Sequence, residues 1–136
     1  MATESATRQG TKTSIIPLLS VRSGVKAIDF YKAAFGAQEL FRMEEGGAVF
    51  AQLSVEGAEF WVSDESPEHK NFSPEALGGG TVRLILVVGD PDGVFAKAVS
   101  AGASVVHPVG EEYGWRSGRV ADPFGHHWEI GKPLKR

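Results

Sequence analysis

The sequence predicts an α+β fold made of two tandem βαβββ modules that form a cleft between curved sheets, and three observations support this prediction. Residues 20–37 and 86–103 share one pattern 66 positions apart, namely the end of a strand, a helix and a closing Gly-Ala pair. Three short apolar segments, separated by turn residues, follow each of these helices. A polar stretch with prolines and a Gly-Gly-Gly run lies between the two units. A duplicated unit of this size indicates two small modules that face each other across a cleft.

The first predicted module covers residues 13–64. Ser23 is a candidate N-cap for a helix over residues 25–35, and Gly36 is placed to end that helix. Pro17 lacks an amide hydrogen, so the first strand is predicted to lie at a sheet edge or to contain a bulge. The predicted strands are residues 13–21, 38–43, 48–55 and 58–63.

The second predicted module covers residues 81–132 and follows a connector over residues 65–80. Asp90 is a candidate N-cap for its helix, and Gly102 is placed to end it. Residues 122–125 (DPFG) are predicted to form a turn before the last strand, because each of these residue types favours turns. The predicted strands are residues 81–88, 104–108, 116–121 and 127–131.

Composition argues against several classes of function. The chain has 136 residues, which predicts one domain that contains both modules. Its net charge is −3 without a basic stripe, so binding to nucleic acid is not expected. No apolar run approaches the roughly 20 residues that span a bilayer, and residues 1–12 are predicted to form a polar, flexible tail rather than a secretory signal. With no cysteine for disulfides or thiolate metal sites, the sequence predicts a cytoplasmic protein that does not associate with membranes.

The internal repeat identifies four equivalent positions on the first and last strands of the modules. Trp61 matches Glu129 when the last strands are compared, and Pro17 matches Arg83 when the first strands are compared. If these strands line the cleft, the four side chains converge there. Arg83 and Glu129 are then expected to form an ion pair in a semi-buried cleft.

Three segments show a resemblance to a known family. They are residues 27–37 (AIDFYKAAFGA), 113–125 (YGWRSGRVADPFG) and 122–131 (DPFGHHWEIG). Together with the doubled βαβββ plan, they make the chain similar to the vicinal oxygen chelate superfamily, which includes glyoxalase I, the bleomycin-resistance proteins and the extradiol dioxygenases. Within it, residues 13–132 resemble the small bacterial glyoxalase-like branch. The resemblance implies the fold and a homodimer, because family members commonly pair modules between chains, but it does not specify a reaction.

The resemblance also places the metal site of the family at the four repeat positions. Metal-dependent members have His, Gln or Glu there, and in this sequence Glu129 alone matches. The proline, tryptophan and arginine at the other three positions are not metal ligands, whereas a catalytic divalent metal needs about three protein ligands. We therefore expect neither a metal site nor another cofactor.

Several other side chains are candidates for contacts with a small-molecule ligand. Adjacent strand residues point to opposite faces, so His126 and His127 cannot bind one ion together, and His127 shares the face of Glu129. Trp115 lies in a predicted Gly-containing loop, where it either stacks on a flat ligand or packs against the core. The predicted ligand-binding residues are Trp61, Arg83, Trp115, His127 and Trp128, and Glu129 is the candidate catalytic residue.

The sequence leaves three interpretations of function. In the first, the protein binds a small organic molecule in an aromatic-lined, metal-free cleft, where Arg83 and Glu129 orient the ligand. In the second, it is a glyoxalase-like lyase or isomerase that acts beside a carbonyl group, with Glu129 as the base or a metal ligand. In the third, it is a scaffold without a ligand. We favour the first and expect a homodimer, since a strand-rich protein gains from covering its sheet edges.

Overall fold

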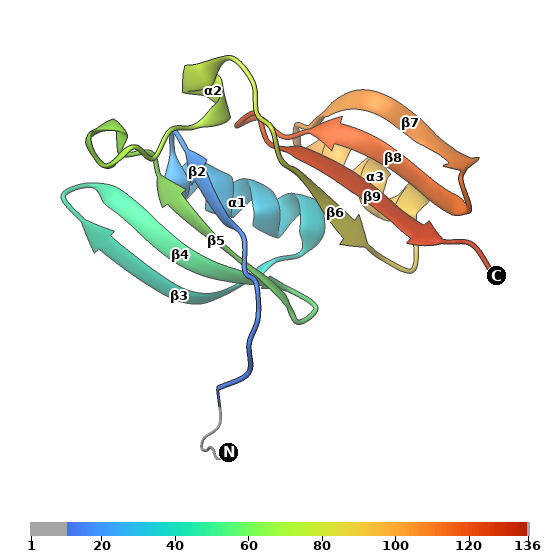
Figure 1. Cartoon of the computed structure of the whole chain (residues 1–136), viewed down its shortest axis with the longest axis horizontal. Helices are drawn as coiled ribbons and strands as arrows, with labels where there is room; N and C mark the ends of the chain where they lie inside the picture. The colour runs from blue at the N-terminus through green and yellow to red at the C-terminus, as the bar shows by residue number, and fades with distance from the viewer. Residues whose placement is uncertain (1–10, 136) are drawn as a thin grey trace.

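Each half of the chain folds into one βαβββ module (Figure 1). The computed structural model describes residues 11–135, and the predicted fold class is confirmed. The first module contains β2 (Leu18–Val21), α1 (Gly24–Phe35), β3 (Gln38–Glu45), β4 (Ala48–Val55) and β5 (Ala58–Asp64). The second module contains β6 (Arg83–Val87), α3 (Pro91–Ala101), β7 (Ser104–Glu112), β8 (Trp115–Ala121) and β9 (His127–Pro133). The connector between them contains a short 3₁₀ helix, η1 (Pro67–His69), and the short helix α2 (Pro74–Leu77).

Each module forms its own four-stranded mixed sheet. The strand orders are β2-β5-β4-β3 and β6-β9-β8-β7, so the first and last strands of each module are neighbours. These neighbours run parallel, and the other pairs are antiparallel. In Figure 1, β2 and β6 lie at the centre of the molecule, and α1 and α3 lie behind the sheets and contact each other. The two sheets are therefore joined through their helices and not through shared strands.

The helices begin and end at the residues that the sequence predicts. The Oγ atom of Ser23 accepts a hydrogen bond from the amide of Lys26, at 3.3 Å, at the start of α1. Asp90 caps α3 in the same way through the amide of Gly93, at 3.1 Å. Gly36 ends α1 with a φ of 68°, a left-handed conformation that glycine adopts without a steric cost. None of the helices within residues 11–135 is long and apolar enough to cross a membrane.

Two predictions about strands and loops are corrected by the structure. The first strand begins at Leu18 rather than at residue 13, because Pro17 has no amide hydrogen to donate; its carbonyl accepts from the amide of Trp61, at 2.8 Å. The predicted loop around Trp115 is a tight hairpin, because β7 and β8 extend as far as a two-residue turn that begins at Tyr113. Of the predicted flexible tail, residues 1–10 lie outside the described residues.

One hydrophobic core joins the two modules. Trp128 of β9 lies against Phe35 of α1 and Phe60 of β5, with ring centroids 4.8 and 5.4 Å apart. Tyr31 of α1 completes this group, 5.3 Å from Phe60 and 5.5 Å from Trp128. All four side chains are buried. Because rings from both modules pack together, the two modules share one core.

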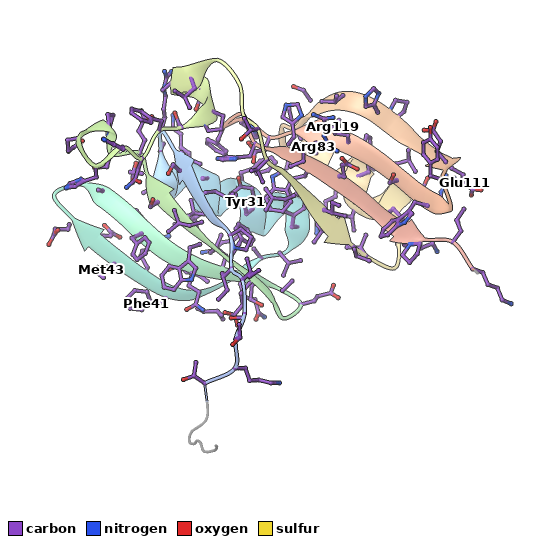
Figure 2. The ribbon with its side chains drawn as sticks, viewed as in Figure 1. Tyr31, Phe41, Met43, Arg83, Glu111 and Arg119 are labelled. Carbon is purple, nitrogen blue, oxygen red and sulfur yellow. The ribbon has the colours of Figure 1, made fainter. Side chains whose placement is uncertain are left out.

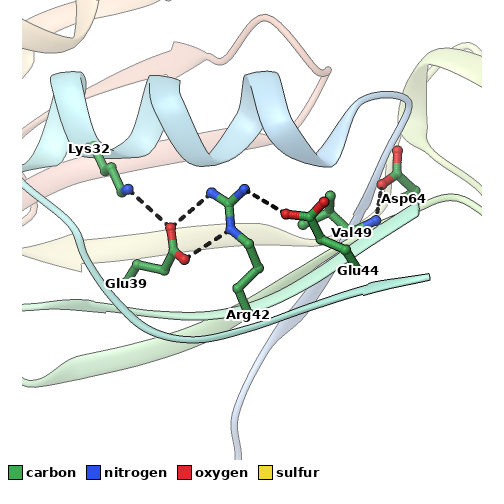
Figure 3. A network of polar contacts seen from close by, with 6 residues as sticks. All are labelled: Lys32, Glu39, Arg42, Glu44, Val49 and Asp64. Atoms are coloured by element: carbon green, nitrogen blue, oxygen red, sulfur yellow. Dashed lines mark hydrogen bonds and ion pairs between the residues drawn. The ribbon is translucent and has the colours of Figure 1, made fainter. Parts of the chain in front are cut away.

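The face of β3 that points toward α1 is charged. Arg42 donates two hydrogen bonds to Glu39, both of 2.9 Å, and Lys32 of α1 donates a third, of 3.0 Å (Figure 3). The hydrogen bonds from Arg42, and then from Lys32, lower the pKa of Glu39 below its ordinary value. At the end of β5, Asp64 accepts a hydrogen bond from the amide of Val49, at 2.7 Å (Figure 3). The pairing of β3 with β4 shifts between Glu39 and Phe41, so Glu39 and Arg42 share this face, and Phe41 and Met43 point away from α1.

Candidate functional site

Each sheet has a helix on one face, and no helix or strand of residues 11–135 packs over the opposite face, which we call the open face. On the open face of the first module, Trp61 stacks on Phe50 with ring centroids 4.7 Å apart and meets Phe41 at 6.0 Å. Strand pairing places Leu18 beside Trp61 and Met43 beside Phe50. Leu18, Phe41 and Met43 are 50%, 44% and 49% exposed. Figure 2 labels Phe41 and Met43 on β3. This open face is therefore an exposed apolar wall.

The open face of the second module is charged. Strand pairing places Arg83 beside His127 and Arg119 beside Glu129. The hydrogen bonds run diagonally across this arrangement: Nε of Arg83 lies 2.5 Å from Oε2 of Glu129, and Nε of Arg119 lies 3.0 Å from Nδ1 of His127. Figure 2 labels both arginines, on β6 and β8. We call these four residues the charged quartet.

The predicted ion pair between Arg83 and Glu129 is present, but it is more exposed than predicted. The two side chains are 53% and 28% exposed, so water screens their attraction. A half-exposed pair of this kind contributes less than about 1 kcal/mol to stability. The pair therefore orients the two side chains rather than stabilising the fold.

The predicted match between Pro17 and Arg83 is wrong by one residue. Leu18 pairs with Trp61 on the last strand of its module, and Ile85 pairs with Glu129. Leu18 is therefore equivalent to Ile85. Because the side-chain period of a strand is 2, a slip of one residue assigns a side chain to the wrong face. The position that corresponds to Arg83 in the first module is Ile16, outside β2.

The two adjacent histidines point in different directions, as predicted. His126 lies in the turn before β9, and its Nε2 donates a hydrogen bond to the carbonyl of Ser20 in the first module, at 2.9 Å. His127 belongs to the charged quartet. Burial, and then the positive charge of Arg119, lower the pKa of His127 below its ordinary value. Its ring is therefore neutral at pH 7, and Nδ1 accepts the hydrogen bond from Arg119.

The three tryptophans lie in three different places. Trp61 is on the apolar open face, and Trp115 lines a hollow of about 390 Å³ together with Glu129 on the other open face. Trp128 is 3% exposed and lies on the helix side of β9, where its Nε1 donates to Asp122 at 2.9 Å. Because Trp128 is adjacent to Glu129 in the strand, it points to the opposite face. Trp128 therefore packs in the core on the helix side of β9, and it also lines a hollow between the two modules.

A buried polar cluster, which sequence reasoning missed, holds the turn before β9. Oδ2 of Asp122 accepts from the hydroxyl of Tyr31, at 2.5 Å, and from Trp128. Its Oδ1 accepts from the amides of Phe124 and His126, both at 2.9 Å. Burial, and then the charge of Asp122, raise the pKa of Tyr31 well above its ordinary value, so the phenol stays protonated and donates. The predicted turn therefore also links α1 to β9.

A larger hollow of about 580 Å³ lies between the two modules. Its walls come from β2 and β5 on one side and β6 on the other, and most of the lining side chains are apolar. Arg83, Glu59 and His126 add polar groups to it. Neither Trp61 nor Trp115 lines this hollow.

The residues at the repeat positions do not fit the metal centre that the family resemblance implies. Glu129 is the one repeat position with a ligating side chain, and Arg83 binds its carboxylate. In the part of the chain that the structure describes, no three His, Asp or Glu side chains lie close enough together to hold an ion. A catalytic divalent metal needs about three such ligands. The open faces carry aromatic rings, guanidinium groups and carboxylates instead, which are groups suited to contacts with organic molecules.

The paired βαβββ modules and the four repeat positions indicate a protein family, and comparison with family models supports this. The glyoxalase/bleomycin resistance protein/dioxygenase superfamily matches residues 16–130. Because this match covers most of the chain, the protein belongs to that family.

Individual relatives support the same assignment. Protein Mb0911c of Mycobacterium bovis is 40% identical over 128 residues, which are 90% of this chain and 84% of the relative. The structure of the Arabidopsis thaliana gene product At5g48480 is 34% identical with a TM-score of 0.70, and the match covers 88% of this chain and 98% of that one. TioX from Micromonospora sp. ML1 is 28% identical with a TM-score of 0.71, over 90% of this chain and 100% of that one.

Proposed function

We propose that this protein binds a small organic ligand between an apolar aromatic wall and a charged wall, without a catalytic metal. The opposite character of the two open faces is the observation that supports this proposal. Trp61 and its neighbouring rings offer contact area to a flat ligand, and the charged quartet offers donors that orient it. Trp115 extends the ligand contacts along the charged face. We expect the protein to act in the bacterial cytoplasm.

We also propose that the protein is a homodimer in which each site is built from two copies. Within one chain, the hollows that contain Arg83, Glu129 and Trp115 do not contain Trp61. A two-fold axis would bring the apolar open face of one copy opposite the charged open face of the other. This arrangement would also cover Phe41 and Met43, whose exposure is unusual for adjacent large apolar side chains on a monomer.

A double substitution on the apolar wall tests the homodimer. We expect light scattering to show a dimer at about 50 μM, and a monomer after Phe41→Glu combined with Met43→Glu, because burying unpaired carboxylates in the interface is costly. Leu77→Glu is the matched control: Leu77 is 65% exposed on α2, so this variant should remain dimeric. A wild-type monomer at this concentration would contradict the proposed arrangement.

Ligand binding is tested by calorimetric screening of small aromatic compounds against the wild type and Trp61→Ala. We expect binding to the wild type, and binding weaker by about tenfold in the variant, because the ligand loses its stacking partner. Phe72→Ala is the control, because Phe72 is also aromatic and is 44% exposed, but it lies in the connector. Equal affinities for wild type and Trp61→Ala would remove the apolar wall from the site.

The lyase interpretation makes a different prediction from the binding interpretation. The metal content of the purified protein and its turnover of the methylglyoxal–glutathione hemithioacetal with added Ni²⁺, Zn²⁺ or Mn²⁺ distinguish the two. We expect no turnover above background. Metal-stimulated turnover that disappears in Glu129→Gln would replace the binding function with an enzymatic one.

A further inference from the structure

Arg119 differs from the other arginines whose side chains the structure describes. Each of the others has a carboxylate oxygen within 4.0 Å; they are Arg22, Arg42, Arg83 and Arg116. Within residues 11–135, Arg119 has no such partner, and its Nε donates to the neutral ring of His127. The side chain of Arg119 is half-buried. Its positive charge is therefore uncompensated at a place from which water is partly excluded.

The charged quartet explains why Arg119 lacks an acidic partner. Glu129 lies directly beside Arg119 in the pairing of β8 with β9. The carboxylate of Glu129 nevertheless binds Arg83 on the opposite side, at 2.5 Å. His127 accepts from Nε of Arg119 and so fixes the orientation of the guanidinium. The two terminal amino groups of Arg119 have no acceptor in the described part of the chain.

Arg119 lines a hollow of about 410 Å³ over the charged open face. His107, which lies beside Arg119 in the pairing of β7 with β8, lines the same hollow. Glu111 and Glu112 line it at the other end, beside the hairpin turn, and Arg116 binds Glu111 at 3.3 Å. Glu129 also lines this hollow beside Arg119, with its carboxylate bound to Arg83, and the hollow is large enough for a small organic ligand.

We propose that Arg119 binds a carboxylate group of the ligand, and that Arg83 makes this possible by holding Glu129 away from Arg119. The terminal amino groups of a guanidinium match the two oxygens of a carboxylate, and this bidentate contact is among the strongest hydrogen-bonded pairs in proteins. The inference rests on the proposed function and adds the ligand class: a small molecule with an apolar ring for the apolar wall and a carboxylate for Arg119.

Matched pairs of acids and amides test this inference by calorimetry. The probes are benzoate and benzamide, 2-naphthoate and 2-naphthamide, and indole-3-acetate and indole-3-acetamide. For the wild type we expect a carboxylate to bind about tenfold more tightly than its amide. Arg119→Gln should abolish this preference while the amide keeps its affinity, and Arg119→Lys should retain part of the preference because it retains the charge.

Substitutions of Glu129 and Arg83 are expected to change the affinity for carboxylates in opposite directions. Glu129→Gln should strengthen carboxylate binding about threefold or more, because it removes a competing negative charge. Arg83→Gln should weaken carboxylate binding, because the released Glu129 is free to pair with Arg119. Arg42→Gln is the matched control, since Arg42 is also a strand arginine bound to carboxylates but lies on β3 of the first module, on the face toward α1.

The outcomes separate this inference from the proposed function. Equal affinities for acids and amides in the wild type would overturn the carboxylate site and leave the binding function in place. A preference for acids that persists unchanged in a folded Arg119→Gln protein would also overturn it. If no compound of any pair binds at about 1 mM, both the inference and the proposed function fail.

Discussion

Asp122→Ala is expected to lower the free energy of unfolding by about 3–5 kcal/mol. The substitution removes the acceptor of two side-chain donors, the hydroxyl of Tyr31 and the indole N–H of Trp128. It also removes the acceptor of the amides of Phe124 and His126. Asp122 is 4% exposed, so water does not replace the lost acceptor, and each unsatisfied donor adds a desolvation cost.

Urea denaturation with a two-state analysis measures this change. Asp92→Ala is the control, because its carboxylate is 52% exposed and binds Arg116 at the surface; we expect a loss below about 1 kcal/mol. Tyr31→Phe removes a single hydrogen bond of the cluster and should give an intermediate loss of about 1–2 kcal/mol. If Asp122→Ala costs no more than Asp92→Ala, the buried cluster does not stabilise the junction of the modules.

Gly131→Ala is expected to have the second largest effect, a loss of about 1–3 kcal/mol. A Cβ atom at this position of β9 would lie 2.5 Å from Cβ of Ser117 and 2.8 Å from the carbonyl oxygen of Arg116, both on β8. The two strands would have to separate to relieve these contacts. The change also affects the site, because Gly131 lines the hollow that contains Trp115.

Two further variants separate overpacking from a general effect of replacing glycine in this sheet. Gly110→Ala on β7 is the control, because a Cβ atom there meets nothing within 4 Å, and its stability should hardly change. Ser117→Gly combined with Gly131→Ala should recover part of the loss, since one of the two close contacts disappears. A stable Gly131→Ala protein, or no recovery in the double variant, would argue against crowding between β8 and β9.

Most of the candidate site follows from strand periodicity alone. The alternation of side chains predicts that His127 shares a face with Glu129 and that His126 does not, and the structure agrees. The same alternation places Trp128 on the helix side of β9, away from Glu129, where it lines the hollow between the two modules. Arg119 has no local sequence feature that distinguishes it from other arginines in strands. Its proposed role depends on the contact between Arg83 and Glu129, which are 46 positions apart.

By itself, the sequence determined the two βαβββ modules, their helix caps and their hairpin turns. Each of these depends on residues within a few positions of one another, such as Ser23 with the amide of Lys26. The tertiary structure decided how the modules meet and which charges remain unpaired. The hydrogen bond between Tyr31 and Asp122 joins residues 91 positions apart, and a strand shift of one residue was enough to misplace Pro17. Contacts of this kind depend on packing and register across the whole domain, which local sequence patterns do not encode.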